Sequence, residues 1–105
     1  MRIGVPKEIK VHEYRVGLTP ASVREAVLHG HSVMVQSDAG SAIGLLDDDY
    51  RTAGATIVES AEEVFAQAEM IVKVKEPQAA EWKQLRENQA VSYTHLRAHE
   101  TSLHL

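Results

Sequence analysis

Short apolar runs alternate along the chain with segments of helical period. This alternation predicts β-α-β units and a parallel sheet, because each crossover between parallel strands needs an intervening segment that packs on the sheet. The expected fold class is therefore α/β, with a doubly wound, mostly parallel sheet. The pattern predicts strands at residues 3–5, 33–35, 55–58 and 70–75, and helices over residues 20–29, 47–53, 61–68 and 80–86.

The helix boundaries are predicted from capping chemistry. Thr19 can cap free N–H groups, and Pro20 suits the first helical position. Gly30 suits the left-handed conformation that ends many helices. Ser60 and Glu63 have the spacing of a capping box at the start of a later helix.

Composition narrows the class of protein. With 105 residues, 44% hydrophobic and 25% charged, the chain can form one small domain with a core, and disorder over its whole length is not expected. A net charge of −4 argues against nucleic acid as a main partner, because phosphate binding needs clustered Lys and Arg. The absence of cysteine excludes disulfides, zinc–thiolate sites and a cysteine nucleophile.

The sequence lacks the patterns of a membrane span, a signal peptide and a metal site. No apolar run approaches the roughly 18 residues of a membrane span, and the N-terminus lacks the apolar stretch of a signal peptide. We therefore expect a cytoplasmic protein with no membrane association. The histidines have no partners at suitable spacing, so no metal site is expected.

The segment at residues 7–18, between the first strand and the first helix, is a candidate binding loop. It is longer than the usual connection of about 2 to 6 residues, and it follows the carboxyl end of a strand, where open parallel sheets bind ligands. Arg15 can hold an anion there, because its planar guanidinium pairs with a carboxylate at two points. Alternatively, Arg15 pairs with Glu8 or Glu13 at the surface.

Lys73 and Lys75 form the second candidate. Alternate side chains of a strand share a face, so both lysines point to one side. On an interior strand this is costly unless that side is a cleft; on an edge strand, the lysines would be solvated and would discourage sheet association. In a parallel sheet, Lys75 and Arg15 lie at the same end and can converge on one small anion.

Three segments of the chain form a specific pattern. They are Met-Arg-Ile-Gly-Val-Pro-Lys-Glu-Ile-Lys at 1–10 with Glu-Tyr-Arg-Val-Gly-Leu-Thr-Pro at 13–20, Gly-His-Ser-Val at 30–33 with Gly-Ala at 54–55, and Val-Lys-Val-Lys-Glu-Pro at 72–77. Together they resemble the N-terminal part of alanine dehydrogenases, and the resemblance covers residues 1–90. It implies a Rossmann-like substrate domain that is incomplete in this chain. The related transhydrogenase alpha subunit shares the opening pattern, whereas the last segment fits alanine dehydrogenase better.

The resemblance implies conversion of L-alanine, NAD and water to pyruvate, ammonium and NADH. Carried over, Arg15 clamps the substrate carboxylate and Lys75 contacts its keto or carboxylate oxygen, which favours the binding interpretation of both residues. NAD is expected to be bound by a domain absent from this chain. These residues alone are therefore expected to be inactive, while the parent enzyme is expected to be a homo-oligomer, commonly a hexamer.

The family's catalytic histidine is an acid/base on the strand after the last helix. The candidate here, His95, lies one residue short of the family register, and such a slip turns a side chain to the opposite face of a strand. No clear strand or helix period fits residues 91–105, which contain half of the six histidines. We interpret residues 91–105 as a non-native tail, a hypothesis that reading the gene from an independent clone would test.

Two alternatives to the alanine dehydrogenase assignment stay open. The first is the N-terminal domain of a transhydrogenase alpha subunit, which transfers hydride without an amino acid. The second is a non-catalytic module that binds small carboxylates through Arg15 and Lys75.

Overall fold

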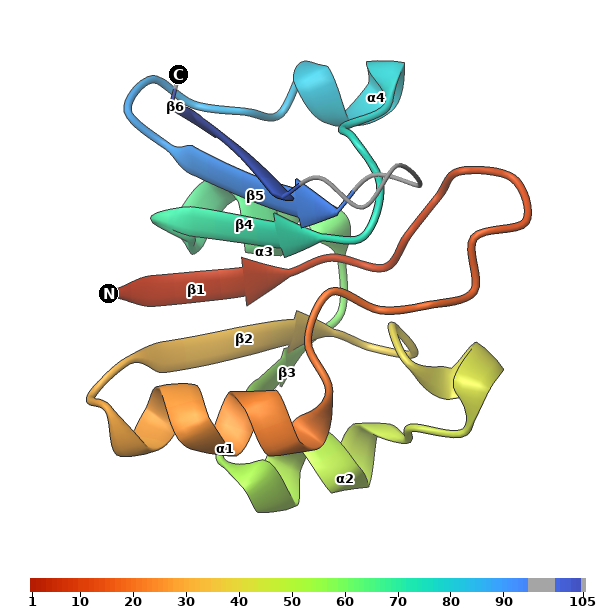
Figure 1. The fold of residues 1–105 in the computed structure, drawn as a ribbon, viewed down its shortest axis with the longest axis vertical. Coiled ribbons are helices and arrows are strands. Elements are labelled where there is room, and N and C mark those ends of the chain that lie inside the picture. The colour runs from red at the N-terminus through yellow and green to blue at the C-terminus, as the bar shows by residue number, and fades with distance from the viewer. Residues whose placement is uncertain (95–99, 105) are drawn as a thin grey trace.

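The chain folds around one six-stranded sheet (Figure 1), seen in a computed structural model that describes residues 1–94 and 100–104. The strand order is β3-β2-β1-β4-β5-β6; the neighbouring pairs from β3 to β5 are parallel, and β6 is antiparallel to β5. The predicted mostly parallel sheet is confirmed. The strands are β1 (Arg2–Val5), β2 (Ser32–Gln36), β3 (Thr56–Val58), β4 (Met70–Lys73), β5 (Ala90–Thr94) and β6 (Glu100–His104).

Both ends of α1 (Pro20–Leu28) and the start of α3 (Ala61–Gln67) lie where capping chemistry predicts. Thr19 accepts a hydrogen bond from the Ser22 backbone N–H at 3.3 Å, and Gly30 follows the first helix with φ +89°. The Ser60 hydroxyl accepts from the Glu63 N–H at 3.3 Å. The helices are α1 (Pro20–Leu28), α2 (Asp47–Ala53), α3 (Ala61–Gln67) and α4 (Ala79–Trp82), with a 3-10 turn η1 (Ser41–Ile43).

Helices cover both faces of the sheet, so the predicted doubly wound arrangement is confirmed. Ile3 and Val5 on β1 pack into the core cluster that also contains Val23 of α1 and Tyr50 of α2. Gly4, between them on β1, belongs to the opposite face of the sheet and lies against α3. A Cβ built on Gly4 would stand 2.7 Å from Val64 Cγ1 of that helix. Figure 1 shows α3 behind β4 and α1 in front of β3.

Three local predictions are wrong. The fourth strand ends at Lys73 rather than at residue 75, and the last helix ends at Trp82 rather than at residue 86. The stretch for which no strand was expected contains β5 and β6. Ser92 and Thr94 obscure the apolar pattern of β5, but pairing with β4 decides its conformation, since strand preference depends on cross-strand partners.

The sheet reverses its winding between β1 and β4. From β1 the chain moves outward through β2 and β3, then returns to place β4 on the other side of β1. The carboxyl ends of β1 and β4 therefore lie side by side at the switch point, where open α/β sheets bind ligands. The candidate loop at residues 7–18 and Lys75 both follow these two ends.

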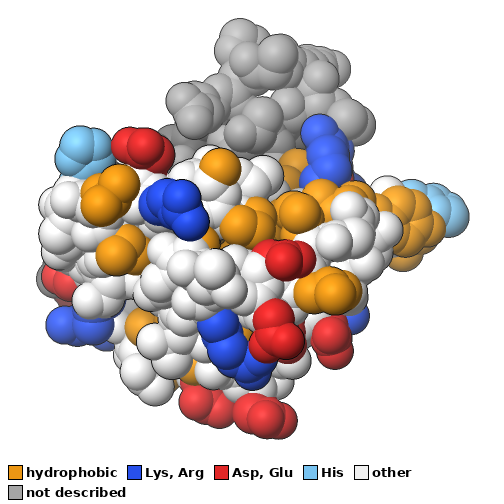
Figure 2. Space-filling view, turned by 90° about the horizontal axis from the view of Figure 1, so that it is seen from below, with side chains coloured by type: hydrophobic (Ala, Val, Ile, Leu, Met, Phe, Trp, Pro, Cys, Tyr) orange, Lys and Arg blue, Asp and Glu red, His pale blue; other side chains and the backbone are white. Residues whose placement is uncertain are grey.

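Figure 2 looks from below, toward α1 and α2, and shows acidic and basic side chains interspersed with apolar ones rather than gathered into a basic patch. Within the described ranges, no helix is long and apolar enough to cross a membrane.

Candidate functional site: a cationic pocket at the switch point

A long loop carries Arg15 from β1 to the end of β4. Residues 6–19 leave β1, extend beyond the sheet edge and return to the start of α1 (Figure 1). Gly17 lies directly against β4, because a Cβ built on it would stand 2.4 Å from the Val72 carbonyl oxygen. Only glycine permits such a close approach of two backbones. The returning limb of the loop is thereby held next to the residues that follow β4.

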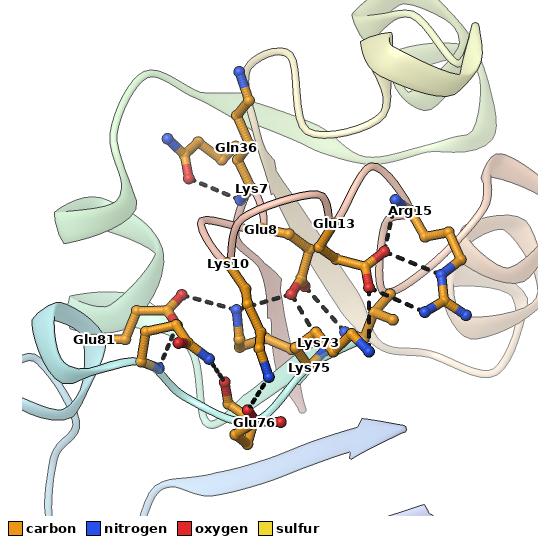
Figure 3. A network of polar contacts seen from close by, with 12 residues as sticks. Lys7, Glu8, Lys10, Glu13, Arg15, Gln36, Lys73, Lys75, Glu76 and Glu81 are labelled. Carbon is orange, nitrogen blue, oxygen red and sulfur yellow. Dashed lines mark hydrogen bonds and ion pairs between the residues drawn. The ribbon is translucent and has the colours of Figure 1, made fainter. Parts of the chain in front are cut away.

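Arg15 and Lys75 meet at the Glu13 carboxylate (Figure 3). Glu13 Oε1 accepts a hydrogen bond from Arg15 Nη2 at 3.0 Å and lies 3.7 Å from Lys75 Nζ. Glu13 Oε2 accepts from Arg15 Nε at 3.0 Å and from the Arg15 backbone N–H at 2.9 Å. The structure thus brings together the two cations that the sequence analysis singled out.

Of the alternative interpretations, the pairing of Arg15 with Glu13 is confirmed, whereas the edge-strand position of the lysines is not. The side chain of Glu13 is only 4% exposed, against 56% for Arg15, so the pair is more than a contact between two solvated residues. Lys75 is buried, with its side chain 7% exposed. The edge-strand interpretation is wrong, because β4 lies between β1 and β5 and the lysine that ends it, Lys73, is buried.

Two adjoining pockets open at this site. One, of about 340 Å³, is bounded by both Arg15 and Lys75; its lining also includes Lys10, Val11, His12, Glu13 and Tyr14. The other, of about 380 Å³, shares Glu13, Tyr14 and Arg15 with the first. The rest of its lining consists of Lys7, Glu8, Asp38, Ala39, Ser41 and Ala42. A small anion entering the first pocket would meet a guanidinium and an ammonium together.

A buried ionic triad of Glu8, Lys73 and Glu81 lies beneath the pocket (Figure 3). Lys73 Nζ donates to Glu8 Oε1 at 3.1 Å and to Glu81 Oε2 at 2.9 Å. Glu8 also accepts from the backbone N–H groups of Val74 at 3.0 Å and Lys75 at 3.3 Å. The triad therefore fixes the backbone from which the Lys75 side chain projects.

Glu81 connects the buried triad to the last helix, α4. Its Oε1 accepts from the Gln78 backbone N–H at 2.9 Å, which closes a capping box at the start of α4. One carboxylate thus connects the cation that ends β4 to the helix that follows.

The two glutamates of the site differ in proton affinity. Burial raises the pKa of Glu8 above its ordinary value and outweighs the opposing effects of Lys73 and of the backbone hydrogen bonds. The hydrogen bond from Arg15 lowers the pKa of Glu13, and the same contact raises the pKa of Arg15. Glu13 is therefore an anion at neutral pH.

A further ion pair holds the outer part of the loop. Lys10 Nζ donates to Glu76 Oε1 at 2.6 Å, which lowers the pKa of Glu76 to about 2. This pair connects the outgoing limb of the loop to the segment that follows Lys75.

The sequence analysis identified the cations of the site but not the carboxylates that pair with them. It treated Glu8 and Glu13 only as possible surface partners of Arg15, and it assigned no role to Glu81. One signal was present: a lysine on an interior strand requires a buried carboxylate, so Lys73 implied a nearby acidic partner. His95 lies outside the described residues, and its predicted role stays a prediction.

The described residues do not fit a dinucleotide. Such sites place a helix N-terminus and a Gly-x-Gly-x-x-Gly turn directly after β1. Here β1 is followed by Pro6, Lys7 and Glu8, α1 begins only at Pro20, and the sequence contains no such glycine pattern. In the described parts of the chain, no group of three or more His, Asp or Glu side chains is placed to hold a metal ion.

The fold and the site together define an α/β domain with a pocket at its switch point that is bounded by Arg15 and Lys75. Comparison with known proteins gives the family. The family model described as "Alanine dehydrogenase/PNT, N-terminal domain" matches residues 4–104, and the chain belongs to this family.

Curated relatives named alanine dehydrogenase are similar over most of the chain. Identity is 49% over 102 residues with the protein from Halomonas elongata and 50% over 97 residues with that from Methanococcus maripaludis, covering 96% and 91% of this chain. These matches cover only 28% and 26% of the relatives. The chain thus spans little more than a quarter of their length.

Two solved structures have the same fold. An L-alanine dehydrogenase superposes with a TM-score of 0.86 at 48% identity, covering 90% of this chain and 26% of the other. A transhydrogenase from Sinorhizobium meliloti superposes with a TM-score of 0.84 at 28% identity, covering 90% and 27%. Both share the fold, and the sequence is more similar to the first.

Proposed function

We propose that this chain is the substrate-binding domain of an NAD-dependent alanine dehydrogenase, which converts L-alanine, NAD and water to pyruvate, ammonium and NADH. The observation that carries the proposal is that Arg15 and Lys75, from separate segments of the sequence, bound one pocket at the switch point. The similarity to alanine dehydrogenases supports the same assignment.

In this proposal, the Arg15 guanidinium binds the substrate carboxylate. Glu13 uses the Nε and Nη2 donors of Arg15 and leaves other guanidinium N–H groups for a ligand. The Lys75 ammonium contacts the keto oxygen or the second carboxylate oxygen. Two charge-assisted contacts on one small molecule fix its orientation as well as its affinity.

The proposal assigns NAD binding to residues outside this chain, because the described residues do not form a dinucleotide site. Hydride transfer requires the cofactor and the substrate to be held in contact. The 105 residues alone are therefore proposed to bind pyruvate without oxidising alanine. A cytoplasmic location and assembly of the parent enzyme as a homo-oligomer, a hexamer on the family pattern, belong to the same proposal.

The first prediction concerns Arg15. Titrating pyruvate into the 105-residue chain, followed by ¹H–¹⁵N NMR, is expected to shift the backbone signals of Arg15 and Lys75. Arg15→Ala should weaken binding by about tenfold or more, since a charge-assisted hydrogen bond contributes roughly 1.5–3 kcal/mol.

Arg24→Ala is the matched control, because Arg24 is an exposed arginine on α1 away from the pocket. Equal pyruvate affinity in the wild type and in both variants would refute the clamp. In the same samples, NADH formation from L-alanine and NAD by this chain alone would refute the proposed need for other residues.

A transhydrogenase N-terminal domain is the second candidate, and the superposition on the Sinorhizobium meliloti structure favours it. Such a domain would not select an amino or keto acid. Arg15-dependent binding of pyruvate would support the alanine dehydrogenase assignment, and its absence would favour the transhydrogenase. A carboxylate-binding module without chemistry would bind pyruvate in the same way, but no NADH would form in the complete protein.

A further inference from the structure

We propose that Glu13 is a specificity-determining residue that makes this pocket select monocarboxylates over dicarboxylates. The inference rests on the proposed function, since it concerns the ligand that Arg15 and Lys75 hold. It assigns a role to the carboxylate that stands between them.

The charge balance of the pocket supports this role. Arg15 and Lys75 bring two positive charges, and Glu13, in contact with both, removes one. Lys10, the other cation of the lining, is neutralised by Glu76 at 2.6 Å. A ligand with a single carboxylate therefore brings the cluster to neutrality, whereas a second carboxylate leaves an excess negative charge.

Glu13 is well held in this position. Three hydrogen bonds from the side chain and the backbone of Arg15 orient its carboxylate, and the side chain is almost fully buried. Its lowered pKa keeps it ionised at neutral pH. The negative charge is thus a fixed feature of the pocket rather than a mobile surface charge.

The adjoining pocket offers no compensation for a longer dianion. Its lining adds one cation, Lys7, and one further carboxylate, Asp38, so these two charges offset each other. Its Glu8 belongs to the buried triad. In the first pocket, Lys10 is paired with Glu76 at 2.6 Å, and His12 contacts the Tyr14 hydroxyl at 3.3 Å. A ligand extended from Arg15 in either direction gains no net positive charge.

The test compares two ligands that differ only at the far end. The keto acids 2-oxopentanoate and 2-oxoglutarate have the same chain length, and only the second ends in a carboxylate. Their dissociation constants for the 105-residue chain are measured by NMR titration at pH 8. The wild type is expected to prefer 2-oxopentanoate.

Glu13→Gln should shift the ratio of the two dissociation constants by about tenfold toward 2-oxoglutarate, the effect of removing one like charge several ångströms away in a partly solvated site. Glu13→Asp keeps the charge and should keep the wild-type preference. Glu62→Gln is the matched control: Glu62 is an exposed carboxylate of α3 that lines neither pocket, and its loss should leave the ratio within about twofold.

An unchanged ratio in folded Glu13→Gln would overturn the inference while leaving the proposed function intact, provided that pyruvate binding still depends on Arg15. If neither of these keto acids nor pyruvate binds to any variant, the proposed function fails and the inference fails with it. If pyruvate alone binds, ligand length rather than Glu13 sets the selectivity, and the inference is overturned. Glu13→Ala serves as a second neutral variant should Glu13→Gln not fold, and the same shift in the ratio is expected of it.

Discussion

At the scale of single residues, the most constrained charge is Lys73. Its side chain is 0% exposed and is satisfied by two carboxylates, Glu8 and Glu81. Taking an ammonium out of water is costly, and only close ionic partners offset that cost. We therefore infer that the triad acts mainly by fixing the backbone around Lys75, and that its net contribution to the free energy of unfolding is smaller.

Replacing Lys73 with methionine is predicted to destabilise the chain by about 3–5 kcal/mol, because Glu8 and Glu81 would remain buried without their cation. The measurement is the free energy of unfolding in urea. Lys83→Met, at an exposed position, is the matched control and should change that free energy by less than about 0.5 kcal/mol. Equal effects of the two substitutions would show that the triad contributes nothing.

At the scale of elements, the site depends on how the loop at residues 6–19 packs against β4. The contact is made by backbone, with Gly17 next to Val72, and no side chain can be inserted there without moving the loop. Because Arg15 is two residues away, the same contact places its guanidinium near Lys75. The loop is long, yet its course is fixed at this one point.

Gly17→Ala is predicted to destabilise the chain by about 1–3 kcal/mol, the usual cost of overpacking, and to weaken pyruvate binding by moving Arg15. Thermal unfolding and the pyruvate titration measure the two effects. Gly30→Ala is the contrasting variant: an added Cβ there meets nothing within 4 Å, although φ is +89°. It should cost stability through backbone strain but leave pyruvate affinity unchanged. Wild-type affinity in Gly17→Ala would contradict the positioning role.

At the scale of the whole molecule, the acidic groups give the chain a pH-dependent stability. Glu76 has a folded pKa of about 2 against 4.5 when unperturbed, so its contribution is present above about pH 4.5 and is lost as the pH falls through 2. Glu13 and Asp47, whose pKa values are also lowered, act in the same direction. Glu8 acts oppositely: its contribution is present below 4.5 and is lost as the pH rises through its raised pKa.

The melting temperature is therefore predicted to fall as the pH is lowered from about 4.5 toward 2, and Glu76→Gln should reduce the size of that fall. The difference should not exceed about 1 kcal/mol, because the Glu76–Lys10 pair is about one-third exposed and is screened by solvent. Scanning calorimetry across this range, with Glu87→Gln at an exposed position as control, measures it. A pH profile of Glu76→Gln that overlies the wild type would contradict the assignment.

Much of the fold was predictable because it depends on local patterns. Thr19, Pro20 and Gly30 mark the ends of α1, and the apolar runs mark β1 to β4. By contrast, β5 was missed because its polar residues conceal the strand until β4 is present beside it. The interpretation of residues 91–105 as a non-native tail stays a prediction, with the family match extending to residue 104.

The sequence by itself determined the α/β class, the positions of β1 to β4 and of α1 to α3, and the two candidate cations, since these depend on periodicity, capping and the shared end of parallel strands. Only the tertiary structure decided which carboxylates face those cations. Glu8 and Glu13 lie on the loop at residues 6–19 and Glu81 lies on α4, and the distances that pair them with Lys73, Arg15 and Lys75 arise when these segments pack around the end of β4. Electrostatic interactions depend on separation in space, which spacing along the chain does not specify.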